Sequence, residues 1–258
     1  MCFSLEASFG MGAALIPAGG YCIVQAIKKD PKFLPLAAIP VAFGVQQLSE
    51  GLVWRGMETG NQSLVTFGSV IFLFFALPFW PFWIPLAASF LEKRPYMKRF
   101  CQIASVVGFL LGMGFYLPTA MHPADYLTTT TCLHSIHYDT RTLPFFEQFP
   151  VVFQTLYLAA TAVPLFFSFD WKIRGFGFLV VLLAGAAHIS YRYAFISVWC
   201  FFAAFLSFNL VILFYRMTSK SQIRISSPFW ARFLPRKQRA QPAFGFSPGR
   251  PDQAEKNR

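Results

Sequence analysis

The sequence predicts an all-α polytopic membrane protein with seven transmembrane helices, its N-terminus outside the cell and its C-terminus in the cytoplasm. Three observations lead to this class. Of the 258 residues, 55% are hydrophobic, 33 are phenylalanine and only 13% are charged, whereas about a quarter of the residues of soluble domains are charged. The apolar residues form long runs, and the charged residues collect between them and in the C-terminal segment. The apolar interior of a bilayer can accommodate such runs.

Seven runs are long enough to cross a bilayer, which takes about 20 mostly apolar residues. They cover residues 7–27, 34–57, 64–91, 100–119, 151–169, 175–191 and 194–215. The runs predict a membrane domain over residues 1–217 and a basic cytoplasmic tail over residues 218–258. Because the opening residues contain Glu6 and no cationic stretch, the first run is expected to remain as a helix rather than be cleaved as a signal peptide.

The orientation follows from the positions of lysine and arginine, which concentrate on the cytoplasmic side of membrane proteins. Nineteen of the 22 cationic residues lie in one set of loops and in the tail, and only Arg55, Arg141 and Arg192 lie on the other side. The net charge of +11 therefore indicates a lipid bilayer as partner rather than nucleic acid. The basic, aromatic stretch 226–237 is typical either of an anchor on anionic lipid head groups or of a disordered tail.

Two runs contain residues that shape helix packing. Glycines in the fourth run predict close approach of a neighbouring helix. Prolines in the third run predict an irregular inner end of that helix, or a hinge, because proline removes a backbone donor. The two tryptophans among these prolines are expected in an aromatic belt at the cytoplasmic membrane surface. The residues are Gly108, Gly112 and Gly114 in the fourth run and Pro78, Trp80, Pro81, Trp83 and Pro85 in the third.

The candidate site depends on Glu50 and His188, the ionisable residues inside the predicted spans, because such residues are costly in a membrane. Gln46, Gln47 and Trp54 lie three or four residues from Glu50 and share its helix face. We expect this face to point into the bundle, with His188 as a partner at similar depth. Two interpretations remain open, a ligand or ion site and hydrogen bonds that only fix helix packing.

The longest external loop, residues 121–150, contains three of the four histidines. His122, His134, His137 and Asp139 are ligand types that suit zinc, although the pattern lacks the His-Glu-x-x-His spacing of many zinc enzymes. The competing interpretation is an ordinary polar loop. No other cofactor is expected.

The cysteines lack the paired spacing of a zinc ribbon. Cys2 and Cys132 are both predicted to be external, where disulfides persist, and a bridge between them is the first expectation. A bridge from Cys2 to Cys200 is the alternative. Cys22 and Cys101 are expected to be buried thiols.

Three segments together resemble a known family. They are the opening Met-Cys-Phe-Ser, the motif Gly-Val-Gln-Gln-x-x-Glu-Gly-x-x-Trp from Gly44, and the motif Ser-Val-Trp-Cys-Phe-Phe-Ala-Ala from Ser197. The chain resembles, from residue 1 to about residue 215, a family of uncharacterised bacterial multispan membrane proteins that is classed as a domain of unknown function. The resemblance implies a location in the bacterial inner membrane and transfers no activity.

Three functional hypotheses follow, and they leave open whether the chain is an enzyme. The leading one is an outward-opening polar pocket that binds or conducts a small ligand, lined by Gln46, Gln47, Glu50, Trp54 and His188, with Trp199. The second is a metal-dependent membrane hydrolase at the outer leaflet that uses the histidines of the external loop. The third is a structural or assembly protein. The sequence has neither a lysine in the seventh run for a retinal Schiff base nor a nucleotide-binding fingerprint.

Overall fold

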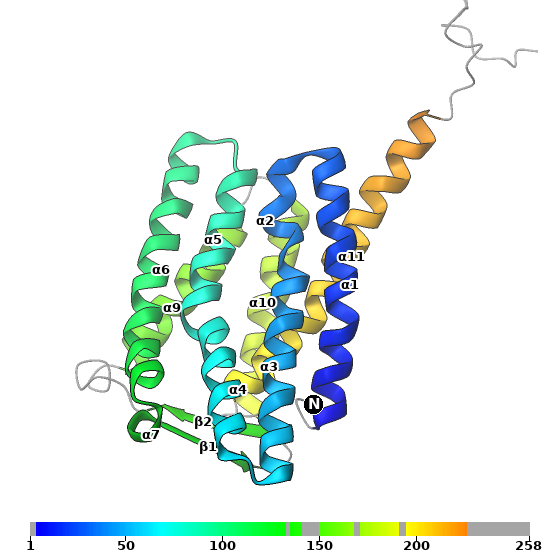
Figure 1. The fold of residues 1–258 in the computed structure, drawn as a ribbon. Helices are drawn as coiled ribbons and strands as arrows, with labels where there is room; N and C mark the ends of the chain where they lie inside the picture. Colours follow the sequence, from blue (N-terminus) through cyan, green and yellow to red (C-terminus); the bar gives the residue numbers. More distant parts are fainter. Residues whose placement is uncertain (1–3, 133–134, 141–149, 168–170, 191–194, 226–258) are drawn as a thin grey trace, which may run out of the picture. The chain divides into compact units, whose positions relative to one another are not determined.

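A helix lies at each of the seven apolar ranges of the sequence (Figure 1). This computed structural model describes residues 4–132, 135–140, 150–167, 171–190 and 195–225. The chain divides into two compact units, Met1–Thr218 and Ser219–Arg258. The elements, in chain order, are α1 (Leu5–Lys29), η1 (Pro31–Phe33), α2 (Leu34–Ala37), α3 (Ile39–Thr59), α4 (Gln62–Phe74), the π-helix η2 (Phe75–Phe79), α5 (Trp80–Leu91), α6 (Pro95–Met121), α7 (Pro123–Tyr126), β1 (Leu127–Cys132), β2 (Ser135–Thr140), α9 (Pro150–Phe166), α10 (Trp171–Ser190) and α11 (Phe195–Ile225).

The helices of the first unit run between two ends (Figure 1). At one end, which we term the basic end, the chain reverses through Lys28–Lys32 and through Lys93–Arg94. The Arg94 guanidinium donates a hydrogen bond to the carbonyl of Phe167, so α9 also ends there. At the other end, the hairpin end, α3 stops at Gly60 in a left-handed conformation (φ 67°), which glycine adopts readily. The α7 helix and the two strands lie at this end.

Helices α1 and α3 approach closely because glycines face each other across their contact. A Cβ on Gly12 would lie 2.6 Å from the Leu48 side chain, and one on Gly19 would lie 2.6 Å from the Val41 backbone nitrogen. Small residues of this kind let membrane helices pack backbone against backbone. The contact places α3 inside the bundle, and 67% of the most apolar stretch of Pro31–Thr59 is buried.

Helix α6 packs against backbone carbonyls that prolines leave without their usual partners. Pro81 has no N–H to donate to Leu77, and Pro85 has none to donate to Pro81. A Cβ on Gly112 would lie 2.4 Å from the Leu77 carbonyl oxygen, and one on Gly108 would lie 2.4 Å from that of Pro81. Glycine Cα–H groups can contact such oxygens directly. These two glycines therefore have the packing role that the sequence predicts.

The proline-rich helix is irregular in its middle rather than at its inner end. The π-helical turn Phe75–Phe79 separates α4 from α5, and the helix continues to Leu91 at the basic end. The first proline, Pro78, lies inside the π turn. The irregularity therefore lies beside the buried face of α3 rather than at the membrane surface.

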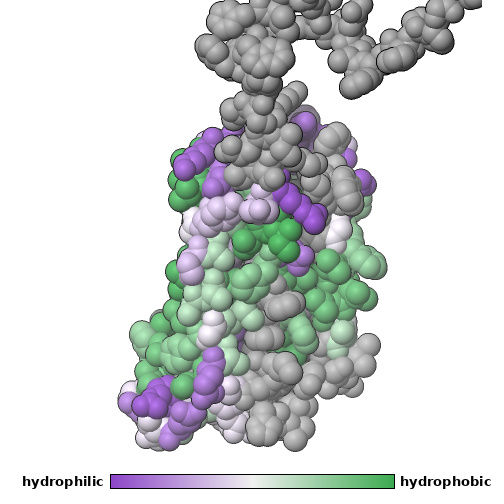
Figure 2. All heavy atoms as spheres, turned by 90° about the vertical axis from the view of Figure 1, so that its right-hand side faces the viewer, coloured by the Kyte–Doolittle hydropathy of each residue, from purple (hydrophilic) through white to green (hydrophobic). Residues whose placement is uncertain are grey.

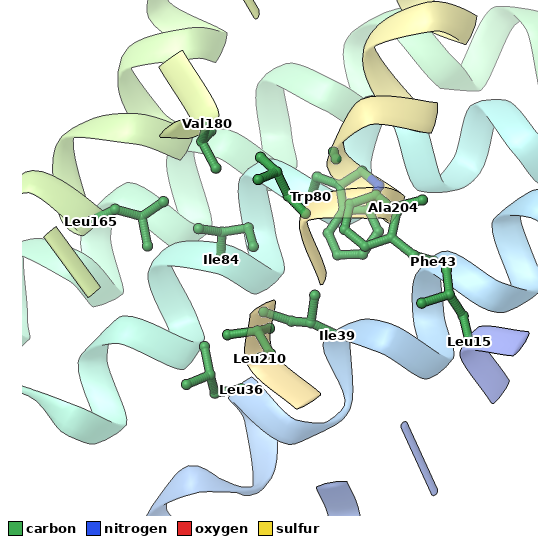
Figure 3. Packing of buried hydrophobic residues seen from close by; sticks show 12 residues of the cluster. Leu15, Leu36, Ile39, Phe43, Trp80, Ile84, Leu165, Val180, Ala204 and Leu210 are labelled. Atoms are coloured by element: carbon green, nitrogen blue, oxygen red, sulfur yellow. The ribbon is translucent and has the colours of Figure 1, made fainter. Parts of the chain in front are cut away.

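The largest buried apolar cluster joins α1, α2, α3, α5, α9, α10 and α11 (Figure 3). The Phe43 ring of α3 stacks on the Trp80 indole of α5, with centroids 3.8 Å apart and planes at 21°. Stacked aromatic pairs contribute about 0.5–1.5 kcal/mol beyond the area they bury. The other residues labelled in the figure are Leu15, Leu36, Ile39, Ile84, Leu165, Val180, Ala204 and Leu210.

Five helices in the described part of the chain are long and apolar enough to cross a membrane: Leu5–Lys29, Pro31–Thr59, Gln62–Leu91, Pro95–Met121 and Val198–Arg216. Helix α9 contributes a shorter apolar stretch, Thr155–Phe166. On the face shown in Figure 2, hydrophobic residues lie in the middle and hydrophilic residues gather towards the two ends. Large apolar side chains are also exposed on α6, where Ile103 and Leu110 are 64% and 63% exposed. This distribution is that of a membrane protein.

The two-stranded sheet is an addition to the all-α class that the sequence predicts. Strand β1 pairs antiparallel with β2, with Thr129 opposite Tyr138 and Thr131 opposite Ile136. This segment is a loop in the sequence-based prediction. The signal for strands is the run of β-branched threonines, followed by Ile136 and Tyr138 alternating with polar residues, because period two places alternate side chains on one face.

Candidate functional site

The polar face of α3 is buried in the bundle. Gln46, Gln47 and Glu50 have no exposed surface, and Ser49 is 3% exposed. The Ser49 hydroxyl donates to the Gln46 carbonyl at 2.7 Å and is satisfied within its own helix. A buried carboxyl and two buried amides are costly unless other groups hydrogen-bond to them. The partners of these three side chains therefore determine what the face can do.

The indole of Trp80 orients the Gln46 amide. Trp80 Nε1 donates a hydrogen bond of 2.8 Å to Gln46 Oε1. Because an indole N–H can only donate, the oxygen of this amide must point at Trp80 and the Nε2 group must point elsewhere. Stacking on Phe43 fixes the indole in turn. Trp80 is thus not in the aromatic belt that the sequence predicts for it, but beside the site and 5% exposed.

Several polar atoms of this face make no hydrogen bond within the described residues. They are Gln46 Nε2, Gln47 Oε1 and Trp54 Nε1. The Gln47 amide does reach Glu50, since Nε2 donates to Oε2 at 3.5 Å, which is long for a hydrogen bond of this type. Two donors and one acceptor are thus left beside a carboxyl group, and a small polar molecule could pair with them.

Cys200 of α11 completes the described surroundings of the face. The thiol is 2% exposed, and it lies close to the side chains of Gln46 and Glu50. Residues from α3, α5 and α11 therefore meet at one place, although they are far apart in the sequence. We term Gln46, Gln47, Glu50, Trp80 and Cys200 the α3 polar site.

A small cavity adjoins the α3 polar site. Its volume is about 50 Å³, and Trp80 and Cys200 form part of its wall. At about 10–15 Å³ for each water molecule, it has room for roughly three to five waters or a small ligand. Apolar side chains dominate the wall, and four aromatic residues, Phe43, Trp80, Tyr157 and Trp199, contribute to it.

The π turn explains how Tyr157 is held in the cavity wall. In a regular α-helix the Ala76 carbonyl would accept from the N–H of Trp80, four residues on. Here that N–H donates to Phe75 instead, and Pro81 has no N–H to offer. The Tyr157 hydroxyl of α9 donates to the freed Ala76 oxygen. An apparent helix defect thus positions an aromatic side chain beside the site.

At the basic end, Arg94 forms an ion pair within the α5–α6 loop and links that loop to the end of α9. Arg94 donates from Nε and Nη2 to the two carboxylate oxygens of Glu92, each at 3.0 Å, and also bonds to Phe167. The hydrogen bonds from the guanidinium lower the pKa of Glu92 to about 2, against the opposing effect of burial. The loop between two membrane helices is therefore held in one conformation.

The predicted site residues fall into three groups. Gln46, Gln47 and Glu50 lie together, and Trp199 lies in the wall of the adjoining cavity. Trp54 is half-buried on the same helix, close to its exposed end at Glu58 and Thr59. The backbone of His188 is in α10, but its side chain lies outside the described residues, so its pairing with Glu50 stays a prediction.

The metal and disulfide predictions fall partly outside the described residues and stay predictions. His122 follows α6, and His137 and Asp139 lie on β2, while His134 is outside the described ranges. Within the described part of the chain no group of three or more histidine, cysteine or acidic side chains is placed to hold a metal. Cys2 and the Cys132 side chain are also outside it. Cys22, Cys101 and Cys200 are free thiols.

Trp80, Tyr157 and the place of Cys200 in the site were not predicted from the sequence. Trp80 and Tyr157 are aromatic residues in apolar runs, and their positions give no signal that distinguishes them from ordinary core or interface residues. Pro78 indicates an irregular helix. It does not indicate that the Ala76 carbonyl oxygen loses its N–H donor and accepts a hydrogen bond from Tyr157, because that contact depends on where α9 packs.

Comparison with known proteins identifies a family. A model for a family described as "Family of unknown function (DUF6629)" matches residues 1–227. No curated protein and no solved structure is significantly similar. The resemblance to a family without known function is thereby confirmed, and no activity comes with it.

Proposed function

The chain belongs to this family of unknown function, and from the α3 polar site we propose that it is a multi-pass membrane protein that binds a small polar ligand inside its helix bundle. We further propose seven spans, an external N-terminus and a cytoplasmic basic end in a bacterial inner membrane. The gathering of Lys28, Lys29, Lys32, Lys93 and Arg94 at one end supports this orientation, since cationic loops face the cytoplasm.

One observation carries the ligand proposal. A fully buried carboxyl group, Glu50, lies beside two fully buried amides, and an amide atom of each, Gln46 Nε2 and Gln47 Oε1, makes no hydrogen bond within the described residues. Helices that only need to pack can do so with apolar or fully paired residues. Leaving a buried donor or acceptor unpaired costs about 1–3 kcal/mol each, and a bound ligand would remove that cost.

The unpaired atoms and the cavity indicate the ligand's chemistry. Gln46 Nε2 calls for an acceptor atom, and Gln47 Oε1 calls for a donor. The ligand therefore both donates and accepts hydrogen bonds, as small alcohols, amides and amino compounds do. A cavity of about 50 Å³ is about a third of the volume of the roughly 150 Å³ apolar cavity that holds benzene. The ligand is accordingly small.

A ligand screen with matched glutamate variants tests the proposal. Purified protein in lipid nanodiscs is heated with a panel of amides, alcohols and amines of up to about four non-hydrogen atoms, a range set by the cavity volume. We expect a subset to raise the melting temperature. Glu50→Gln, which keeps the side-chain shape and removes the charge, should abolish that rise.

The control variant is Glu58→Gln on the same helix, whose carboxylate is 49% exposed. It should respond to the ligands as the unmodified protein does. If no compound in the panel raises the melting temperature, or if the response survives Glu50→Gln, the α3 polar site is not a ligand site of this kind.

A further inference from the structure

The β1–β2 hairpin is attached to the bundle through a few identifiable contacts. Ser69 Oγ of α4 and Thr129 Oγ1 of β1 are hydrogen-bonded at 3.1 Å. The Tyr138 ring stacks on Phe72 of α4, with centroids 4.8 Å apart and planes at 14°, and Ile136 is fully buried. A two-stranded ribbon has little stability of its own in water. Its position therefore depends on these contacts with the bundle.

The inner face of the hairpin packs towards the α3 polar site. Ile136 and Tyr138 belong to one buried cluster that also contains Phe72, Val53 of α3 and Cys200 of α11. Figure 1 shows the two strands crossing the hairpin end of the bundle next to α3 and α4. A ligand that enters from this end must pass the residues on which the hairpin rests.

With the hairpin packed on the bundle, two buried polar atoms make no hydrogen bond within the described residues. They are Ser135 Oγ, at the start of β2, and Trp54 Nε1, which packs against the same cluster. Water would pair with both atoms if the hairpin moved away, so part of the stabilisation from apolar burial is offset. The opposite face of the hairpin is already exposed at Thr128, Thr130 and Asp139.

We propose that the hairpin is a gate that moves as a unit away from α4 to open the α3 polar site towards the hairpin end. The gate rests on the proposed function in that it explains how a ligand reaches a site with no exposed surface. Segments held by few buried contacts open locally without unfolding the rest of a protein, and loop lids commonly control access to binding sites.

A reversible disulfide between hairpin and bundle tests the gate. Ser69→Cys and Thr129→Cys replace two oxygens 3.1 Å apart, so their sulfur atoms should be close enough to bond. The readout is Cys200, which lies in the site. The other four cysteines are replaced by alanine, and the rate at which a charged, water-soluble methanethiosulfonate modifies Cys200 is followed by mass spectrometry of its peptide.

We expect oxidation of the two thiols introduced by S69C and T129C to slow Cys200 modification about tenfold or more, because the open state is no longer populated. Reduction before the reagent is added should restore the rate. The matched control is Thr128→Cys with Asp139→Cys, a register pair whose disulfide staples the two strands together but leaves the hairpin free to move. It should leave the Cys200 rate unchanged.

Three outcomes would overturn the gate. The first is an unchanged rate of Cys200 modification when the disulfide between Ser69→Cys and Thr129→Cys has formed. The second is an equal slowing in the stapled control, since access would then need strand separation rather than movement of the hairpin. The third is no reaction at Cys200 in the unlocked protein while the denatured protein reacts. Because the readout needs no ligand, a failed ligand screen rejects the proposed function and leaves the gate result to be judged separately.

Discussion

At the scale of single residues, the site is built from side chains whose orientation is enforced by their neighbours. Trp80 Nε1 holds the Gln46 oxygen at 2.8 Å, and Phe43 holds the indole by stacking. This chain of contacts leaves Gln46 Nε2 available. Orientation by such fixed partners is what allows a buried site to recognise a ligand without rearranging.

Trp80→Phe tests that orientation. The phenyl ring can still stack on Phe43, but Gln46 Oε1 loses its donor. We expect a loss of about 1–3 kcal/mol in unfolding free energy from a buried unpaired acceptor, and more from the smaller ring. Thermal unfolding in detergent measures it. Trp83→Phe is the control, because Trp83 is only half-buried and its indole donates to the Pro35 carbonyl of α2 rather than to Gln46. Equal losses in the two variants would contradict the role assigned to Trp80.

The Glu92–Arg94 pair predicts a dependence of stability on acid. The pKa of Glu92 is lowered to about 2 in the folded protein, below its ordinary value of about 4.5. A carboxyl with a lowered folded-state pKa stabilises the fold above its unfolded pKa and loses that contribution as the pH falls towards the folded value. The stabilisation should therefore be present at pH 7 and fade between about pH 4.5 and pH 2.

The corresponding variant is Glu92→Gln. At pH 7 it should lower the unfolding free energy by about 1–2 kcal/mol, an amount reduced because the Arg94 side chain is partly exposed. The difference from the unmodified protein should shrink towards pH 2, as followed by thermal unfolding across that range. A constant difference at every pH would mean that shape, and not charge, accounts for the loss.

At the scale of helices, backbone carbonyls without regular partners organise the packing. Leu77 and Pro81 present oxygens to Gly112 and Gly108 of α6, and Ala76 presents one to Tyr157 of α9. Each of these three carbonyls lacks its usual partner because a proline or the π turn removes an N–H donor from the regular α-helical hydrogen bonds. The proline-rich helix therefore determines where its two neighbours can lie.

Gly112→Ala tests the contact between η2 and α6. The new Cβ would lie 2.4 Å from the Leu77 carbonyl oxygen, and two backbones must separate to admit it. We expect a loss of about 1–3 kcal/mol. Gly20→Ala on α1 is the matched control, because no atom lies within 4 Å of its new Cβ. It should be neutral or stabilise the helix by about 0.5–1 kcal/mol. Equal melting temperatures for the two variants would count against close backbone packing.

At the scale of the whole membrane unit, the two ends differ in charge and can be assigned to the two sides of a membrane by labelling. In a background without native external thiols, Thr130→Cys at the exposed face of the hairpin should react with an impermeant reagent in intact cells. Lys32→Cys at the exposed basic end should react only after lysis. Reaction of Lys32→Cys but not Thr130→Cys in intact cells would reverse the proposed orientation.

The class of this protein could be predicted from composition and pattern, because each depends on local sequence. Long apolar runs define helices that can cross a bilayer, and the spacing of Gln46, Gln47 and Glu50 predicts one polar helix face. Burial of that face followed from the cost of exposing it to lipid. The glycines of α6 likewise predicted close packing, since a residue without a side chain lets a neighbouring helix approach whichever helix that is.

Only the tertiary structure decided which residues meet that face. Trp80 and Cys200 lie at that face, and Tyr157 lines the cavity beside it. The three residues come from three helices, and nothing in the spacing of one helix says which residue of another lies opposite it. The hairpin was predicted as a loop for a related reason. Its short strands are stable only when Tyr138 and Ile136 pack against the bundle, and that contact cannot be predicted from the local sequence. Local patterns specify the elements, whereas the geometry of the site depends on contacts between elements distant in the chain.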